Sequence, residues 1–88
     1  MTSEQITKFV EEKHLAITPL KIDFKTRQSI IGLFIKHTDY SELKPKNFWR
    51  IVAEARIKEY RSTQELSLCR IFNGQEITKL SVPKNQTV

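Results

Sequence analysis

The chain has 88 residues, enough for one small domain and too few for two. Hydrophobic residues make up 39% and charged residues 28% of it, which excludes a chain that is disordered throughout. The net charge of +5 favours anionic partners such as nucleic acid. No stretch approaches the roughly 18 consecutive apolar residues of a membrane span. Among possible partners, we expect nucleic acid or a protein and no membrane.

The residue types that build metal, nucleotide and redox sites are scarce. Cys69, His14 and His37 are too few for a zinc site, and Gly32 and Gly74 cannot supply a glycine-rich phosphate loop. We therefore expect no metal, no cofactor and no catalytic residue, and a binding protein in place of an enzyme. The single cysteine favours a reducing compartment, the cytosol or, in a eukaryote, the nucleus.

The first predicted element is a helix over residues 2–14. Thr2 and Gln5 have the spacing of a capping box, and apolar residues follow at helical intervals: Ile6, Phe9 and Val10. Residues 15–23 contain a proline and show no clear period, so we expect a connecting segment and leave a short strand within it open. Asp23 is the expected N-cap of the next helix.

Residues 24–37 are predicted to form a central buried helix. Their apolar side chains leave little of the helix circumference polar: Phe24, Ile30, Ile31, Leu33, Phe34 and Ile35. Inside a helix, Gly32 costs about 1 kcal/mol relative to alanine. We therefore expect a neighbouring backbone to pack closely against it.

A third helix is predicted over residues 46–61, after a polar, turn-like segment and Pro45, which suits the first turn of a helix. One stripe of this helix has i, i+3, i+4, i+7 spacing and is predicted to face the core: Phe48, Ile51, Val52 and Ala55. A second stripe lies beside it: Trp49, Ala53, Arg56 and Tyr60.

Asn73 and Gly74 separate two short apolar segments, residues 66–72 and 76–82, as in a β-hairpin. The alternative is a fourth helix that begins with a capping box at Ser62 and ends at the glycine. Periodicity favours the hairpin, because the apolar side chains would scatter around a helix axis but gather on one face of paired strands.

Together these elements predict an α+β fold, a three-helix bundle followed by a C-terminal β-hairpin. It would form a single domain of residues 1–82 with a flexible tail at residues 83–88. This element order resembles that of winged-helix domains, in which the last helix reads the major groove and the hairpin contacts the phosphate backbone.

Most of the net charge lies in residues 44–61, where six Lys and Arg stand against two Glu, a net charge of +4. The first hypothesis is a small regulatory protein that binds nucleic acid, DNA in preference to RNA, through this basic helix. The candidate binding residues are Lys44, Lys46, Arg50, Arg56, Lys58 and Arg61. The same charges also fit a solvated helix face held by i, i+4 pairs between Glu54 and its basic neighbours.

The second hypothesis is a protein-interaction or adaptor module, which could be a homodimer. Trp49 and Tyr60 would then form the partner surface, and the charge would serve steering and solubility. In the first hypothesis the same two aromatic side chains could stack on bases.

Overall fold

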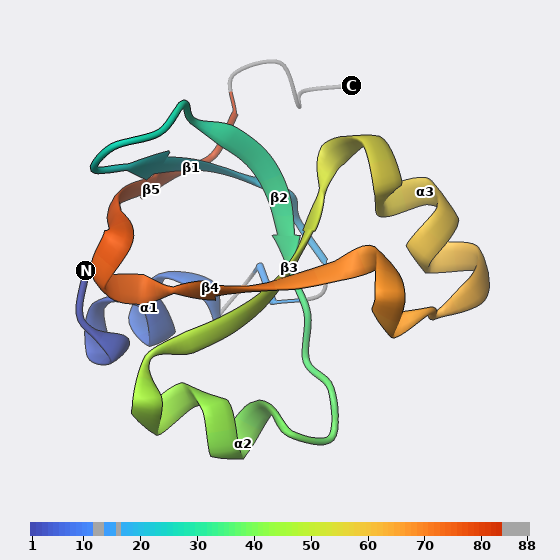
Figure 1. Ribbon diagram of the computed structural model, residues 1–88, viewed down its shortest axis with the longest axis horizontal. Helices are drawn as coiled ribbons and strands as arrows, with labels where there is room; N and C mark the ends of the chain where they lie inside the picture. The colour runs from blue at the N-terminus through green and yellow to red at the C-terminus, as the bar shows by residue number, and fades with distance from the viewer. Residues whose placement is uncertain (12–13, 16, 84–88) are drawn as a thin grey trace.

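The computed structural model describes residues 1–11, 14–15 and 17–83. In this part of the chain, three α-helices accompany a five-stranded antiparallel sheet (Figure 1). The strands are β1 (Leu20–Phe24), β2 (Ile30–Phe34), β3 (Phe48–Ala53), β4 (Cys69–Asn73) and β5 (Ile77–Ser81). The helices are α1 (Ser3–Val10), α2 (Tyr40–Leu43) and α3 (Glu54–Thr63), with short 3-10 helices η1 (Lys44–Lys46), η2 (Leu66–Leu68) and η3 (Gly74–Glu76).

The sheet has the strand order β4-β3-β2-β1-β5, and its strands curl around the inner face (Figure 1). β4 and β5 lie at opposite edges, yet only the three residues of η3 join them along the chain. The two edges must therefore approach each other, as in a small barrel. One contact marks this approach: the rings of Phe24 in β1 and Phe72 in β4 lie 5.6 Å apart.

Both faces of the sheet are covered in part, each by one helix. On the inner face, Ile6 and Val10 of α1 pack against Trp49 and other buried residues of the sheet: Leu20, Ile22, Phe34, Ile51, Ile77 and Leu80. On the outer face, Ile57 and Tyr60 of α3 pack against Leu33, Ile35 and Val52. α1 and α3 consequently lie on opposite sides of the curled sheet (Figure 1).

The predicted three-helix bundle with a C-terminal hairpin is wrong, because strands and helices are interleaved. Residues 24–37, predicted as the central helix, contain the end of β1, a loop and β2. Asp23, expected as an N-cap, lies in β1. Alternate residues of β2 enter the inner and outer cores, and this burial on both faces produces the continuous apolar run that we interpreted as a buried helix.

Residues 46–61, predicted as one basic helix, contain β3 and the first part of α3. The apparent helical stripe arises because the two elements follow each other directly, with the chain turning at Ala53 and no proline or glycine marking the boundary. The winged-helix order of elements is lost with this helix.

The predicted strands around Asn73 and Gly74 exist as β4 and β5, and no fourth helix replaces them. Their predicted pairing is wrong, because β4 pairs with β3 and β5 pairs with β1. Asn73 caps the short helix η3 by accepting a hydrogen bond from the Gln75 amide, so the local turn signal marks a crossover between sheet edges.

Several local predictions are confirmed. Thr2 and Gln5 form the capping box of α1, although the helix ends at Val10, earlier than predicted. A strand does begin within residues 15–23, at Leu20. A Cβ atom on Gly32 would lie 2.6 Å from the Ile51 side chain and 3.2 Å from the Val52 carbonyl, so the neighbouring strand does pack closely there.

Of the tail predicted for residues 83–88, all but Pro83 lies outside the described residues. Within the described part of the chain, every helix is too short and too polar to cross a lipid bilayer.

Candidate functional site

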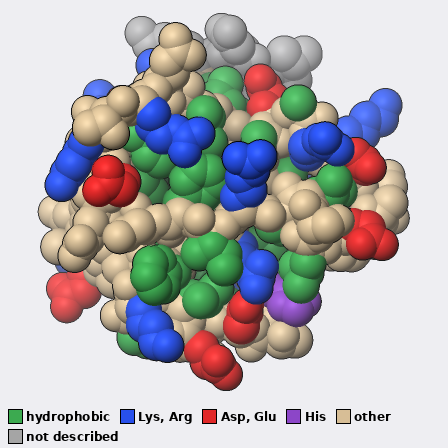
Figure 2. Space-filling view, in the orientation of Figure 1, with side chains coloured by type: hydrophobic (Ala, Val, Ile, Leu, Met, Phe, Trp, Pro, Cys, Tyr) green, Lys and Arg blue, Asp and Glu red, His purple; other side chains and the backbone are tan. Residues whose placement is uncertain are grey.

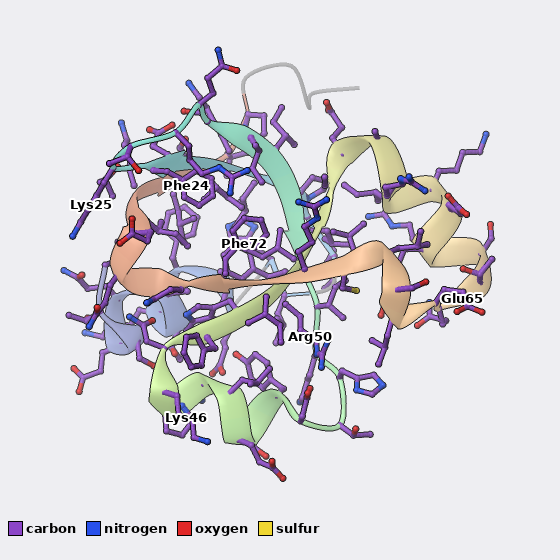
Figure 3. All side chains as sticks on the ribbon, in the orientation of Figure 1. Phe24, Lys25, Lys46, Arg50, Glu65 and Phe72 are labelled. Carbon is purple, nitrogen blue, oxygen red and sulfur yellow. The ribbon has the colours of Figure 1, made fainter. Side chains whose placement is uncertain are left out.

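The basic residues selected from the sequence do not share one surface. Lys44 pairs with Glu11, with 2.9 Å between Nζ and Oε2, and Lys46 lies beside it in η1. Arg50 donates to both carboxylate oxygens of Asp39, with 2.7 Å for the shortest contact, which lowers the pKa of Asp39 below its ordinary value. Lys46 and Arg50 lie on the α2 side of the molecule (Figure 3).

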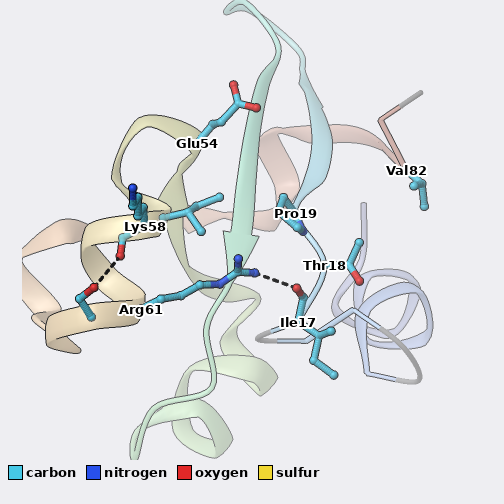
Figure 4. Close-up of a pocket in the computed structure, with 9 residues that line it drawn as sticks. Ile17, Thr18, Pro19, Glu54, Lys58, Arg61 and Val82 are labelled. Carbon is cyan, nitrogen blue, oxygen red and sulfur yellow. Dashed lines mark hydrogen bonds between the residues drawn. The ribbon is translucent and has the colours of Figure 1, made fainter. Parts of the chain in front are cut away.

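The remaining candidates lie on α3, and they divide between two recesses. Lys58 and Arg61 line a recess of about 750 Å³ beside residues 17–19 (Figure 4). There the Arg61 guanidinium donates to the Ile17 carbonyl at 2.9 Å, so this arginine already has a structural partner. Arg56 lines a different recess, which is described below.

Trp49 and Tyr60 are core residues. Their side chains are 1% and 7% exposed, so neither offers a surface to a base or to a partner unless the core opens. Trp49 packs on the inner face, where its Nε1 donates to Asn47 Oδ1 at 2.8 Å, and Tyr60 packs on the outer face.

The feature that stands out is a recess of about 450 Å³ inside the curl of the sheet, which we call the arginine hollow. Three arginines form its rim, and its interior is largely apolar. The rim residues are Arg27, Arg56 and Arg70; the interior includes Ile30, Ile51 and Phe72. Ile51 is 1% exposed and forms part of the floor.

Strand register explains why these side chains meet. Arg70 pairs with Ile51, and Phe72 pairs with Trp49, so both β4 side chains share the inner face with residues of the core. Arg27 lies in the loop between β1 and β2, and Arg56 lies in the first turn of α3. Because α1 fills only one part of the inner face, the remainder stays open as the hollow.

The hollow is electropositive. In the described part of the chain, no Asp or Glu lines it, and neither Arg27 nor Arg70 has a carboxylate within 4.0 Å. Arg56 approaches Glu59 at 3.4 Å, but both side chains are more than half exposed, so this pair is weak. Figure 2 shows Lys and Arg side chains beside the hydrophobic side chains at the centre of this face.

An aromatic pair holds one of these arginines in place. The Arg27 guanidinium carbon lies 5.0 Å from the ring centroid of Phe24 and 5.5 Å from that of Phe72. Figure 3 shows the two phenylalanines facing each other between β1 and β4. Each such cation–π contact contributes about 0.5–1 kcal/mol at an exposed site.

The sequence therefore indicated one residue of the hollow, Arg56, and missed Arg27, Arg70 and Phe72. The nearest local signal was the basic residues of the segment that follows Phe24, but that segment had been assigned to a helix. No sequence spacing predicts that residues of a hairpin loop, a helix N-terminus and an edge strand meet, because only the fold brings these three segments together.

Cys69 lies beside this region on the outer face of β4. Burial raises the pKa of its thiol, and the positive charge of Arg50 offsets this in part. The thiol therefore stays protonated at neutral pH and is a weak nucleophile.

No protein-family model, no curated protein and no solved structure matches the chain.

Proposed function

We propose that the chain binds nucleic acid through the arginine hollow and acts as a small regulatory protein of the cytosol or nucleus. The observation that carries this proposal is the rim itself. Arg27, Arg56 and Arg70 surround one recess that contains no lining carboxylate among the described residues.

Guanidinium groups suit this role because their fixed fork of N–H donors matches phosphate oxygens. Three such groups around one recess repel one another unless an anion lies between them. An arginine that served only solubility would gain from a nearby carboxylate, and Arg27 and Arg70 have none within 4.0 Å in the described part of the chain. A bound polyanion supplies the missing counter-charge.

The test is binding of a labelled 12-residue mixed-sequence DNA, as a single strand and as a duplex, across 50 to 200 mM salt. Three phosphate contacts predict a slope of log affinity against log salt of about −2 to −3. Changing Arg27, Arg56 and Arg70 together to Gln should remove most of the binding and flatten this slope.

Two control variants make the assignment specific. Lys8, Lys36 and Lys79 changed together to Gln remove the same charge from exposed positions outside the hollow and should keep the slope. Lys58 and Arg61 changed to Gln test the α3 surface selected from the sequence. Loss of binding in this last variant, with the hollow variant unaffected, would place the interface on α3 and contradict the proposal.

A second candidate function is protein interaction through β4. This strand is a sheet edge, and its outer face exposes half of Ile71, next to Phe48, which is 37% exposed. An open edge strand with apolar side chains can accept a strand from a partner or from a second copy of the chain. This surface replaces the Trp49 and Tyr60 surface, whose side chains are buried.

Light scattering separates the two candidates. Self-association that Ile71→Thr abolishes, without nucleic-acid binding in the wild type, would favour the interaction module.

A further inference from the structure

The arginine hollow combines a charged rim with an apolar interior, and the two parts suit different parts of a ligand. We infer that its ligand is a single strand, with an unpaired base inside the hollow and phosphates on the rim. This inference rests on the proposed function. A duplex carries its phosphates outside but keeps its base faces stacked within, so it can reach Arg27 and Arg70 but cannot fill the interior around Ile51 and Phe72.

The interior has the properties that base stacking requires. Phe72 is half-buried, which fixes its ring against the core, and Ile30 and Ile51 close the recess behind it. At about 450 Å³, the hollow falls in the size range of pockets that hold small organic molecules. Base stacking on an aromatic side chain tolerates any sequence, because every base has a π face.

A second recess adjoins the hollow and extends the site. It has about 400 Å³ and shares Arg27, Arg70 and Phe72 with the hollow, while Phe24 and Glu76 line its other parts. Two recesses that share two arginines fit two successive nucleotides. One base lies in each recess, and the phosphate that joins them lies over the shared arginines. Glu76 repels phosphate from the far part of the second recess, which favours this placement.

Contacts with two aromatic rings restrict Arg27 at the boundary between the recesses before a ligand arrives. Arg27 is held over both phenylalanine rings, and the rings are held against each other. Less side-chain entropy is therefore lost when a phosphate binds there. The minimal ligand should be a dinucleotide that contains the bridging phosphate.

The experiment compares one 12-residue DNA sequence as a single strand, as the same sequence in a duplex, and as RNA, all at 50 mM salt. The single strand should bind at least about 10-fold more tightly than the duplex, since stacking contributes roughly 1–3 kcal/mol per base. A dinucleotide should compete for the site much better than a mononucleotide. Equal binding of DNA and RNA would support the inference, because no group in it reads the sugar.

A matched pair of variants isolates stacking from charge and from stability. Phe72→Leu keeps an apolar side chain but removes the aromatic face, and it should abolish the preference for single strands while duplex binding persists. Phe48→Leu makes the same change on the outer face of the neighbouring strand and should leave the preference intact. Circular dichroism confirms that both variants are folded.

The outcomes distinguish failure of the single-strand inference from failure of the proposed nucleic-acid binding. If single strand and duplex bind alike and Phe72→Leu changes neither, the inference is wrong while the proposed function stands. If no nucleic acid binds, both fail. If a doubly phosphorylated peptide displaces the single strand at equal concentration, the hollow is a general phosphate site and the inference is overturned.

Discussion

Asn47 links three parts of the fold, and no single sequence pattern predicts all of these contacts. Its backbone has φ of 64°, its side chain accepts from Trp49 Nε1, and the same side chain donates to the Met1 carbonyl at 3.0 Å. Its own carbonyl accepts from the Gly74 amide at 2.8 Å. One residue therefore joins the N-terminus, the start of β3 and the crossover between β4 and β5.

We predict that Asn47→Ala destabilises the fold more than Asn47→Gly does. Both variants leave the buried Trp49 Nε1 without its acceptor, at a cost of about 1–3 kcal/mol. Alanine also keeps a Cβ atom in the left-handed region, which adds about 1 kcal/mol, whereas glycine is free to adopt it. Urea unfolding of both variants checks the ranking. Equal stability of the two would show that the backbone conformation has relaxed.

Gly32 gives a second prediction at this scale. In Gly32→Ala the new Cβ would lie 2.6 Å from the Ile51 side chain, and the side chain or the strand must shift. Overpacking of this kind costs about 1–3 kcal/mol, measured as a lower urea midpoint with an unchanged slope. Gly32→Ala with wild-type stability would mean that Ile51 has another rotamer available.

At the scale of elements, the helices are joined by a few charged contacts. Glu11, which caps α1, accepts hydrogen bonds from Tyr40 of α2 and from Lys44 of η1. These contacts lower the pKa of Glu11, the Tyr40 hydrogen bond having the largest effect. They hold α1 against α2 at the edge of the inner core.

The two hydrogen bonds that Glu11 accepts predict a pH dependence of stability. The folded state holds Glu11 deprotonated to lower pH than the unfolded chain, whose glutamate has an ordinary pKa near 4.5. Below that value the unfolded state binds more protons, so the contribution of Glu11 is lost as pH falls through the folded pKa. Glu11→Gln should therefore lose less stability than the wild type between pH 5 and pH 3, measured by thermal unfolding. Parallel curves for the two proteins would contradict this role.

Element types were predictable only where one face of an element meets water. The helix α1 has a polar face and a capping box, and both were correctly assigned. β2 is packed on both faces, so its apolar run lacks the alternation that marks a strand. The loop between β1 and β2 contains no glycine, proline or asparagine, and nothing in it marks the turn.

At the scale of the whole molecule, pairing of strands is the property that sequence reasoning missed most. β4 and β5 are near neighbours in the chain, and the hairpin rule pairs them. The curled sheet sends them to opposite edges instead, because β5 completes the inner core beside β1. The arginine hollow is a product of that curl, so it could not be predicted before the pairing was known.

Besides lining the arginine hollow, Arg70 hinders self-association through the β4 edge of the sheet. Inward-pointing charges on edge strands discourage pairing with other chains. We predict that Arg70→Val, besides weakening nucleic-acid binding, gives a larger weight-average mass by light scattering than the wild type at equal concentration. Equal masses would show that other features of β4 protect the edge.

The position of β5 also governs how the chain folds. Lys21 of β1 pairs with Ser81 of β5, 60 positions later, so the sheet cannot be completed until Ser81 has left the ribosome. Until then β1 has an open edge and exposes Ile22, which is fully buried in the finished protein. Such long-range pairing slows folding into the millisecond-to-second range and leaves a nascent chain exposed to aggregation. The topology therefore delays completion of the sheet until the last strand of the described chain has been synthesised.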